Sequence, residues 1–154
     1  MPVLALALER VLPSRPPVVF GAFSAASELA EWWGPAGFST PFLDFQARVG
    51  RSYRIEMQPP EGDRFYLTGE FRAVDPPRRL AYTFIWEEPD PDDLEMLVDL
   101  SFRDLGDSTE VALSQGPFKT EARRSLHRDG WTESFDRLER FLACDLTARA
   151  APPG

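Results

Sequence analysis

The chain has 154 residues, a length typical of one domain, and a domain of this size buries about two thirds of its unfolded surface without a disulfide or metal to hold it together. Its net charge of -8 at pH 7 argues against binding to nucleic acid or to anionic membranes, because an acidic surface repels phosphate groups. The single cysteine, Cys144, excludes an internal disulfide and fits a reducing compartment, so we expect a cytoplasmic protein.

The first segment, residues 3–11, alternates small residues with leucines and predicts a β-strand. Its apolar start differs from a signal peptide, because no basic region precedes it and Glu9-Arg10 interrupts it early. No stretch approaches the roughly 20 apolar residues that cross a bilayer, so no membrane partner is expected.

Two short helices are predicted next. Pro16 and Pro17 suit a helix start and precede a short helix at residues 18–23. Ser27 is the expected N-cap of a second helix at residues 28–33, which the following Gly-Pro pair ends.

A run of six segments then alternates apolar and polar residues, with turn residues between them. This pattern is typical of an antiparallel meander with one buried face. The predicted strands are residues 42–49, 52–58, 65–74, 80–87, 94–102 and 109–114.

One long helix, about residues 120–146, is the only segment long enough to cover that face. At about 100° per residue, its apolar residues form one stripe. The start of the stripe is polar, at Thr120 and Arg124, so this end lies either outside the sheet or beside a wet cavity. The apolar stripe comprises His127, Trp131, Phe135, Leu138 and Leu142.

Several motifs resemble those of the heat-shock-protein-90 ATPase activator homologue-like (AHSA-like) family of the START-like, SRPBCC or Bet v-like superfamily. Over about residues 3–142, their order and spacing are similar to the family pattern. The motifs are Trp32-Trp33-Gly34-Pro35 followed by Gly37-Phe38, Asp75-Pro76-Pro77-Arg78-Arg79-Leu80, Gly130-Trp131-Thr132-Glu133 and Leu138-Glu139-Arg140-Phe141-Leu142.

The resemblance implies an α+β helix-grip fold: a curved antiparallel sheet of about six or seven strands, two short helices and a long C-terminal helix that together enclose an apolar cavity. It implies one domain, which we expect to span residues 1–146, with a flexible tail at residues 147–154. Some members of the family stimulate the ATPase of the chaperone.

The many aromatic residues suggest which side chains line such a cavity. Tryptophan and tyrosine need hydrogen-bond partners when buried and so favour cavity walls, and methionine adapts to varied ligands. Arg124 and His127 are expected to meet the polar end of the ligand. The predicted ligand-binding residues are Trp33, Phe38, Tyr53, Met57, Tyr82, Phe84, Trp86, Met96, Arg124, His127, Trp131 and Phe135.

We predict no catalytic residue, metal or cofactor. His127 is the only histidine and has no evident acid–base partner, and one histidine with one cysteine cannot make a zinc site. Cys144 is interpreted as a bystander thiol near a helix C-terminus. The acidic run at residues 87–93 contains two prolines and lacks the glycine turn of a calcium loop, so a solvated hairpin loop is expected.

Three functions remain open at this point. The first is binding of a small apolar or amphipathic molecule between the helix and the sheet. The second is an enzyme of the cyclase or dehydratase kind, which needs paired acid and base groups inside the cavity. The third is a protein-interaction domain, such as a chaperone partner, which requires a large exposed apolar patch; a homodimer interface is the alternative use of such a patch.

Overall fold

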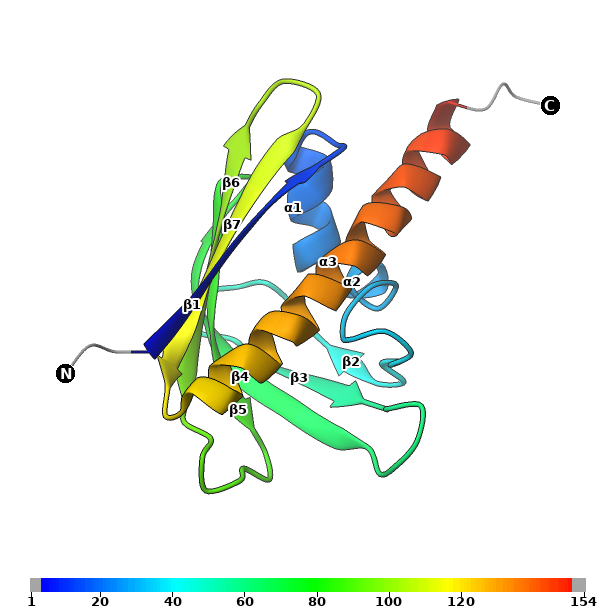
Figure 1. Cartoon of the computed structure of the whole chain (residues 1–154). Helices are drawn as coiled ribbons and strands as arrows, with labels where there is room; N and C mark the ends of the chain where they lie inside the picture. The colour runs from blue at the N-terminus through cyan, green and yellow to red at the C-terminus, as the bar shows by residue number, and fades with distance from the viewer. Residues whose placement is uncertain (1–3, 151–154) are drawn as a thin grey trace.

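Seven strands form one curved antiparallel sheet, and the long helix α3 crosses one side of it (Figure 1). The computed structural model describes residues 4–150 of the chain, and side chains as far as residue 144. The elements are β1 (Leu4–Leu12), α1 (Pro16–Ser24), α2 (Ala26–Leu29), β2 (Leu43–Asp44), β3 (Ser52–Met57), β4 (Phe65–Asp75), β5 (Arg79–Trp86), β6 (Met96–Asp104), β7 (Thr109–Phe118) and α3 (Glu121–Ala150).

The sheet has the order β1-β7-β6-β5-β4-β3-β2, with every neighbouring pair antiparallel. Strands β2 to β7 follow one another in chain order, so the predicted meander is confirmed. The first strand pairs with the last, from Leu4↔Phe118 to Leu12↔Thr109. This pairing places β1 beside α3, and Arg10 forms an ion pair of 2.9 Å with Asp136 of the helix. The α+β helix-grip architecture is confirmed.

The apolar stripe of α3 faces the sheet as predicted, and all five of its residues are buried. At the start of the helix, the Thr120 hydroxyl accepts a hydrogen bond of 3.1 Å from the Arg123 backbone amide and so acts as the N-cap. Arg124 turns towards the β1 edge, where its guanidinium donates to the Ala5 carbonyl at 3.3 Å. The polar start of the stripe therefore lies at the edge of the sheet.

The predicted elements at residues 42–49 and 28–33 were wrong in extent, and the last predicted strand, 109–114, continues to Phe118 as β7. Only residues 43–44 of the predicted strand 42–49 pair with β3, because Gln46 bridges instead to Ala25 and Phe45 packs into the core. The bridge holds Ala25 in an extended conformation, so α2 begins at Ala26 and Ser27 is not its N-cap. Helix α2 also ends at Leu29, because the chain continues in turns towards Gly34, whose φ is +95°.

The predicted boundary at residue 146 falls inside α3, which continues to Ala150. Residues 151–154 of the predicted tail lie outside the described residues, so the tail remains a prediction. No helix in the described part of the chain is both long and apolar enough to cross a membrane.

Candidate functional site

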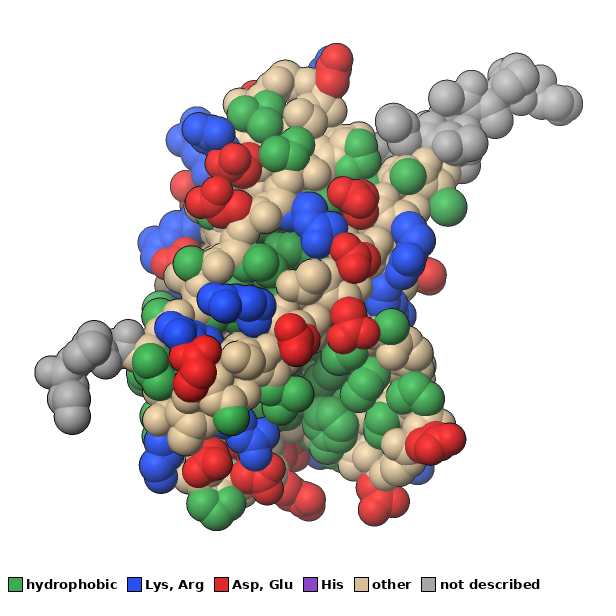
Figure 2. Space-filling view, viewed as in Figure 1, with side chains coloured by type: hydrophobic (Ala, Val, Ile, Leu, Met, Phe, Trp, Pro, Cys, Tyr) green, Lys and Arg blue, Asp and Glu red, His purple; other side chains and the backbone are tan. Residues whose placement is uncertain are grey.

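A cavity of about 370 Å³ lies between the first half of α3 and the ends of β3, β4 and β5. Its mouth is visible in Figure 2 as a hollow lined by hydrophobic side chains beside the long helix. The chain between α2 and β2 forms one wall, and the loop between β5 and β6 borders the opening. The lining residues are Trp33, Gly34, Pro35, Phe38, Met57, Phe65, Tyr66, Phe84, Trp86, Glu88, Asp90, Asp93, Arg123, Leu126, His127, Gly130, Trp131 and Ser134.

The structure places seven of the twelve predicted ligand-binding residues on this wall. They come from four separate segments, and ring contacts link them: Trp33 meets Trp131 edge-on at 5.3 Å, and Phe84 meets Trp86 at 5.1 Å. The seven are Trp33, Phe38, Met57, Phe84, Trp86, His127 and Trp131.

Tyr53 and Tyr82 do not line the cavity. They belong to an aromatic cluster with Phe45 and Phe71, in which neighbouring ring centroids lie 4.9–6.0 Å apart. The Tyr53 hydroxyl donates to the Thr83 carbonyl at 2.6 Å. Burial raises the pKa of both phenols well above the ordinary value, so both stay protonated and neither offers a base at neutral pH.

The remaining three predicted residues also lie outside the lining. Phe135 is fully buried and packs between Phe23 and Trp131, so it is part of the core. Met96 lies behind the wall, with its sulfur 3.6 Å from the amide nitrogen of Gln115. Arg124 points away towards β1 and pairs with Glu121.

A buried glutamine supports two of the wall residues. Gln115 of β7 accepts a hydrogen bond of 2.6 Å from the Trp131 indole, and its amide nitrogen lies 3.4 Å from Nδ1 of His127. All three side chains are buried, so these contacts are made away from water and fix the indole and imidazole relative to each other.

His127 is held in a mostly aromatic setting. Its ring lies 5.5 Å from Phe84, 6.0 Å from Trp86 and 5.1 Å from Phe118. Burial lowers the pKa of His127 to about 4, and the nearby charges of Asp93 and Arg123 act in opposite directions. The imidazole is therefore neutral at pH 7.

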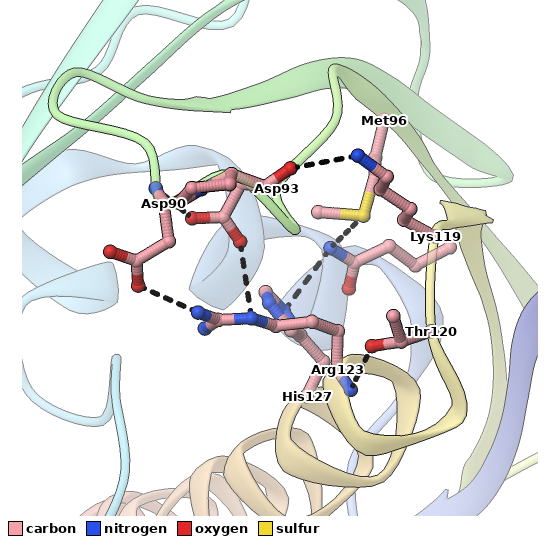
Figure 3. A network of polar contacts seen from close by, with 9 residues as sticks. Asp90, Asp93, Met96, Lys119, Thr120, Arg123 and His127 are labelled. Atoms are coloured by element: carbon pink, nitrogen blue, oxygen red, sulfur yellow. Dashed lines mark hydrogen bonds and ion pairs between the residues drawn. The ribbon is translucent and has the colours of Figure 1, made fainter.

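An ion-pair network joins α3 to the loop that borders the cavity (Figure 3). We call residues 87–95, between β5 and β6, the mouth loop. Arg123 lies 2.6 Å from the Asp90 carboxylate and 3.7 Å from that of Asp93, and Lys119 donates to the Pro91 carbonyl at 3.0 Å. Residues 87–92 of the predicted solvated loop are exposed, but the Asp93 side chain is only 7% exposed, so the prediction fails at this residue.

A second arginine fixes the opposite wall. Nη1 of Arg137 lies 2.9–3.1 Å from the backbone carbonyl oxygens of Trp33, Gly34 and Pro35. Burial lowers the pKa of Arg137 below its ordinary value. This guanidinium anchors the segment that carries Trp33 and Phe38 to α3.

Sequence reasoning missed the three residues that hold the site together: Gln115, Arg123 and Arg137. Gln115 carried a usable signal, because it continues the inward alternation of Val111 and Leu113 and is the polar member of that series. The predicted strand ended one residue before it. The two arginines gave no such signal, because their partners are backbone or loop atoms far away in sequence.

The acid–base groups of the wall are not arranged as a catalytic pair: in the described part of the chain His127 contacts the Gln115 amide, and Asp90 and Asp93 pair with Arg123. Within the described residues, no group of three or more His, Cys, Asp and Glu side chains could hold a metal ion. The arrangement is suited to enclosing a mostly apolar molecule.

Comparison with known proteins identifies the family. The family model described as "Activator of Hsp90 ATPase homolog 1-like protein" matches residues 14–143. No curated protein matches the chain.

Solved structures are similar over almost the whole chain. The AHSA1 protein from Silicibacter pomeroyi is 28% identical, with a TM-score of 0.82 over 92% of this chain and 99% of that one. A protein from Chromobacterium violaceum is 25% identical, with a TM-score of 0.82 over 90% of this chain and 96% of that one. Because the family model covers most of its length, this chain belongs to the Activator of Hsp90 ATPase homolog 1-like family.

Proposed function

We propose that this protein binds a small, mostly apolar molecule in the cavity between α3 and the sheet. The observation that carries the proposal is the cavity itself, which has a volume of about 370 Å³ and a mainly apolar wall rich in aromatic residues. This volume falls within the range of roughly 300–1,000 Å³ common for small-molecule sites. Of the seven predicted residues on its wall, five are aromatic and the others are Met57 and His127.

The features that hold the wall in place favour binding. Gln115 orients Trp131 and His127 from behind, and Arg137 anchors the backbone at Trp33. A wall fixed in this way loses little conformational entropy when a ligand enters, which increases affinity. An enzymatic role has less support, because among the described residues no lining carboxylate is hydrogen-bonded to His127, and Asp90 and Asp93 pair with Arg123 instead.

The test uses Gly130, which lies on the wall within α3. A Cβ atom at this position would lie 3.7 Å from Pro35, which is ordinary contact, so Gly130→Ala fits. Gly130→Leu extends a larger side chain from the same wall position. We expect Nile red to bind the wild type and Gly130→Ala with similar affinity, and Gly130→Leu at least about tenfold more weakly.

Native mass spectrometry of freshly purified wild-type protein complements this assay by detecting a co-purified small molecule. Equal binding of Nile red to the alanine and leucine variants, with both folded by circular dichroism, would place the dye outside the cavity. That result, or no binding to any variant and no co-purified molecule, would contradict the proposal.

The family match supports a second candidate, which we also propose for testing: stimulation of the ATPase of an Hsp90 chaperone. Among the described residues, the large apolar side chains that are exposed are Val11, Phe42, Val49, Leu94, Leu97, Leu105 and Leu126. A coupled ATPase assay with a bacterial Hsp90 tests the idea, and an unchanged ATPase rate at saturating protein would argue against it.

A further inference from the structure

The Gln115 contacts determine which nitrogen of His127 carries the proton. An indole N–H can only donate, so the Gln115 atom that it meets at 2.6 Å is the amide oxygen. The amide NH₂ group therefore faces Nδ1 of His127, 3.4 Å away. Because an NH₂ group donates, Nδ1 must accept, and the single proton of a neutral imidazole is then on Nε2.

The Nε2–H group of His127 is left without an acceptor within the described part of the chain. Among the described residues, the side-chain nitrogens that are both fully enclosed and without a partner are Trp33 Nε1 and Arg124 Nε. Nε2 of His127 has no acceptor among the described residues, and it is not one of these enclosed atoms. His127 lines the cavity, so a ligand can reach this donor.

The charges around the cavity are unfavourable for an anion. Arg123 is the only cation among the lining residues, and Asp90 and Asp93 already pair with it. Glu88 adds a further carboxylate to the wall. A ligand carboxylate would therefore lose its water without gaining a free counter-charge, which is costly in an apolar site.

We infer that the ligand is an uncharged apolar molecule with a carbonyl-type oxygen, which accepts a hydrogen bond from Nε2–H of His127, and that carboxylates of the same shape are disfavoured. This inference rests on the proposed function, because it names the ligand class of the same cavity. A carbonyl oxygen suits the site because it accepts a hydrogen bond without carrying a charge.

The test compares two dyes and two variants. Prodan is a neutral naphthyl ketone whose emission moves to longer wavelength when its carbonyl accepts a hydrogen bond, and 6-dimethylamino-2-naphthoic acid is a related carboxylate. His127→Gln keeps an N–H donor on a flexible side chain, and His127→Met has a similar length without that donor. Both variants lose the imidazole ring equally, so their difference reports the donor.

We expect prodan to bind His127→Met about 2- to 10-fold more weakly than His127→Gln, with bound emission at shorter wavelength. The wild type should bind the naphthoate more than about tenfold more weakly than prodan at pH 7. Circular dichroism and thermal melts check that both variants fold; if neither does, the comparison of the two dyes on the wild type decides.

The outcomes separate this inference from the proposed function. If prodan binds the wild type but not Gly130→Leu, yet the two His127 variants do not differ or the naphthoate binds as tightly, only the assignment of the ligand class is overturned. If prodan does not bind the wild type although Nile red does, this inference is contradicted and the proposed function stands; if neither dye binds and no small molecule co-purifies, both are contradicted.

Discussion

The buried histidine should make folding stability depend on pH in a defined direction. The pKa of His127 falls from 6.5 in the unfolded chain to about 4 in the folded protein, because burial disfavours the charged imidazole. Between these values the unfolded state binds more protons, so stability is fully present above pH 6.5 and is lost as the pH falls towards 4. Linkage gives a loss of about 2 kcal/mol from this one group between pH 7 and pH 5.

The variant His127→Gln does not titrate in this range, so its comparison with the wild type removes the effect of most other groups. Urea unfolding at several pH values between 7 and 5, followed by tryptophan fluorescence, gives the free energy of unfolding of each protein. The wild-type value minus the variant value should fall by about 2 kcal/mol across this range.

A difference that stays constant within about 0.5 kcal/mol would refute the reasoning. It would mean that the imidazole is hydrated or charged in the folded protein, and a charged imidazole would carry a proton on both nitrogens. The nearest charges do not change the expected sign, because Asp93 and Arg123 shift the pKa of His127 in opposite directions.

Three further substitutions, two of them with a control variant, test the packing of the wall and of the sheet. Arg137→Met leaves the carbonyls of Trp33, Gly34 and Pro35 without their shared donor, so we expect a loss of about 2–3 kcal/mol in urea unfolding and weaker Nile red binding, with Arg137→Lys closer to the wild type. Gly69→Ala would place a Cβ atom 2.0 Å from the Thr83 carbonyl oxygen and should cost more than about 3 kcal/mol. The control Gly50→Ala has open space at a φ of +87° and should cost only about 1 kcal/mol, so equal losses at the two glycines would contradict the steric argument. Gly130→Ala replaces a helix glycine without a clash and should increase the free energy of unfolding by about 0.5–1 kcal/mol, which raises the thermal midpoint. A lower midpoint would show that the helix needs glycine there.

The strands and the long helix could be predicted from the order of apolar and polar residues. Alternating apolar residues give a strand one apolar face, and apolar residues at helical spacing give a helix one apolar stripe. The stripe from His127 to Leu142 is buried as predicted. The motif at residues 32–38 marks a segment that lines the cavity at Trp33, Gly34, Pro35 and Phe38.

The same patterns could not separate cavity wall from core. Tyr53 and Tyr82 alternate along their strands as Phe84 and Trp86 do, yet the tyrosines pack among other rings while Phe84 and Trp86 face open space. An inward-facing position is decided by the period of the strand. Whether it meets another side chain or a void depends on how the sheet bends relative to α3, which no single strand encodes.

Short-range periodicity was enough to predict the class of the elements, the buried face of the sheet and the helix that covers it. The pairing of β1 with β7, the Gln115 contacts to Trp131 and His127, and the ion pairs between Arg123 and the mouth loop became visible in the fold alone. These contacts join groups from separate elements, and burial depends on what the whole chain brings around a side chain. The neutral state of His127 is therefore a property of the folded chain.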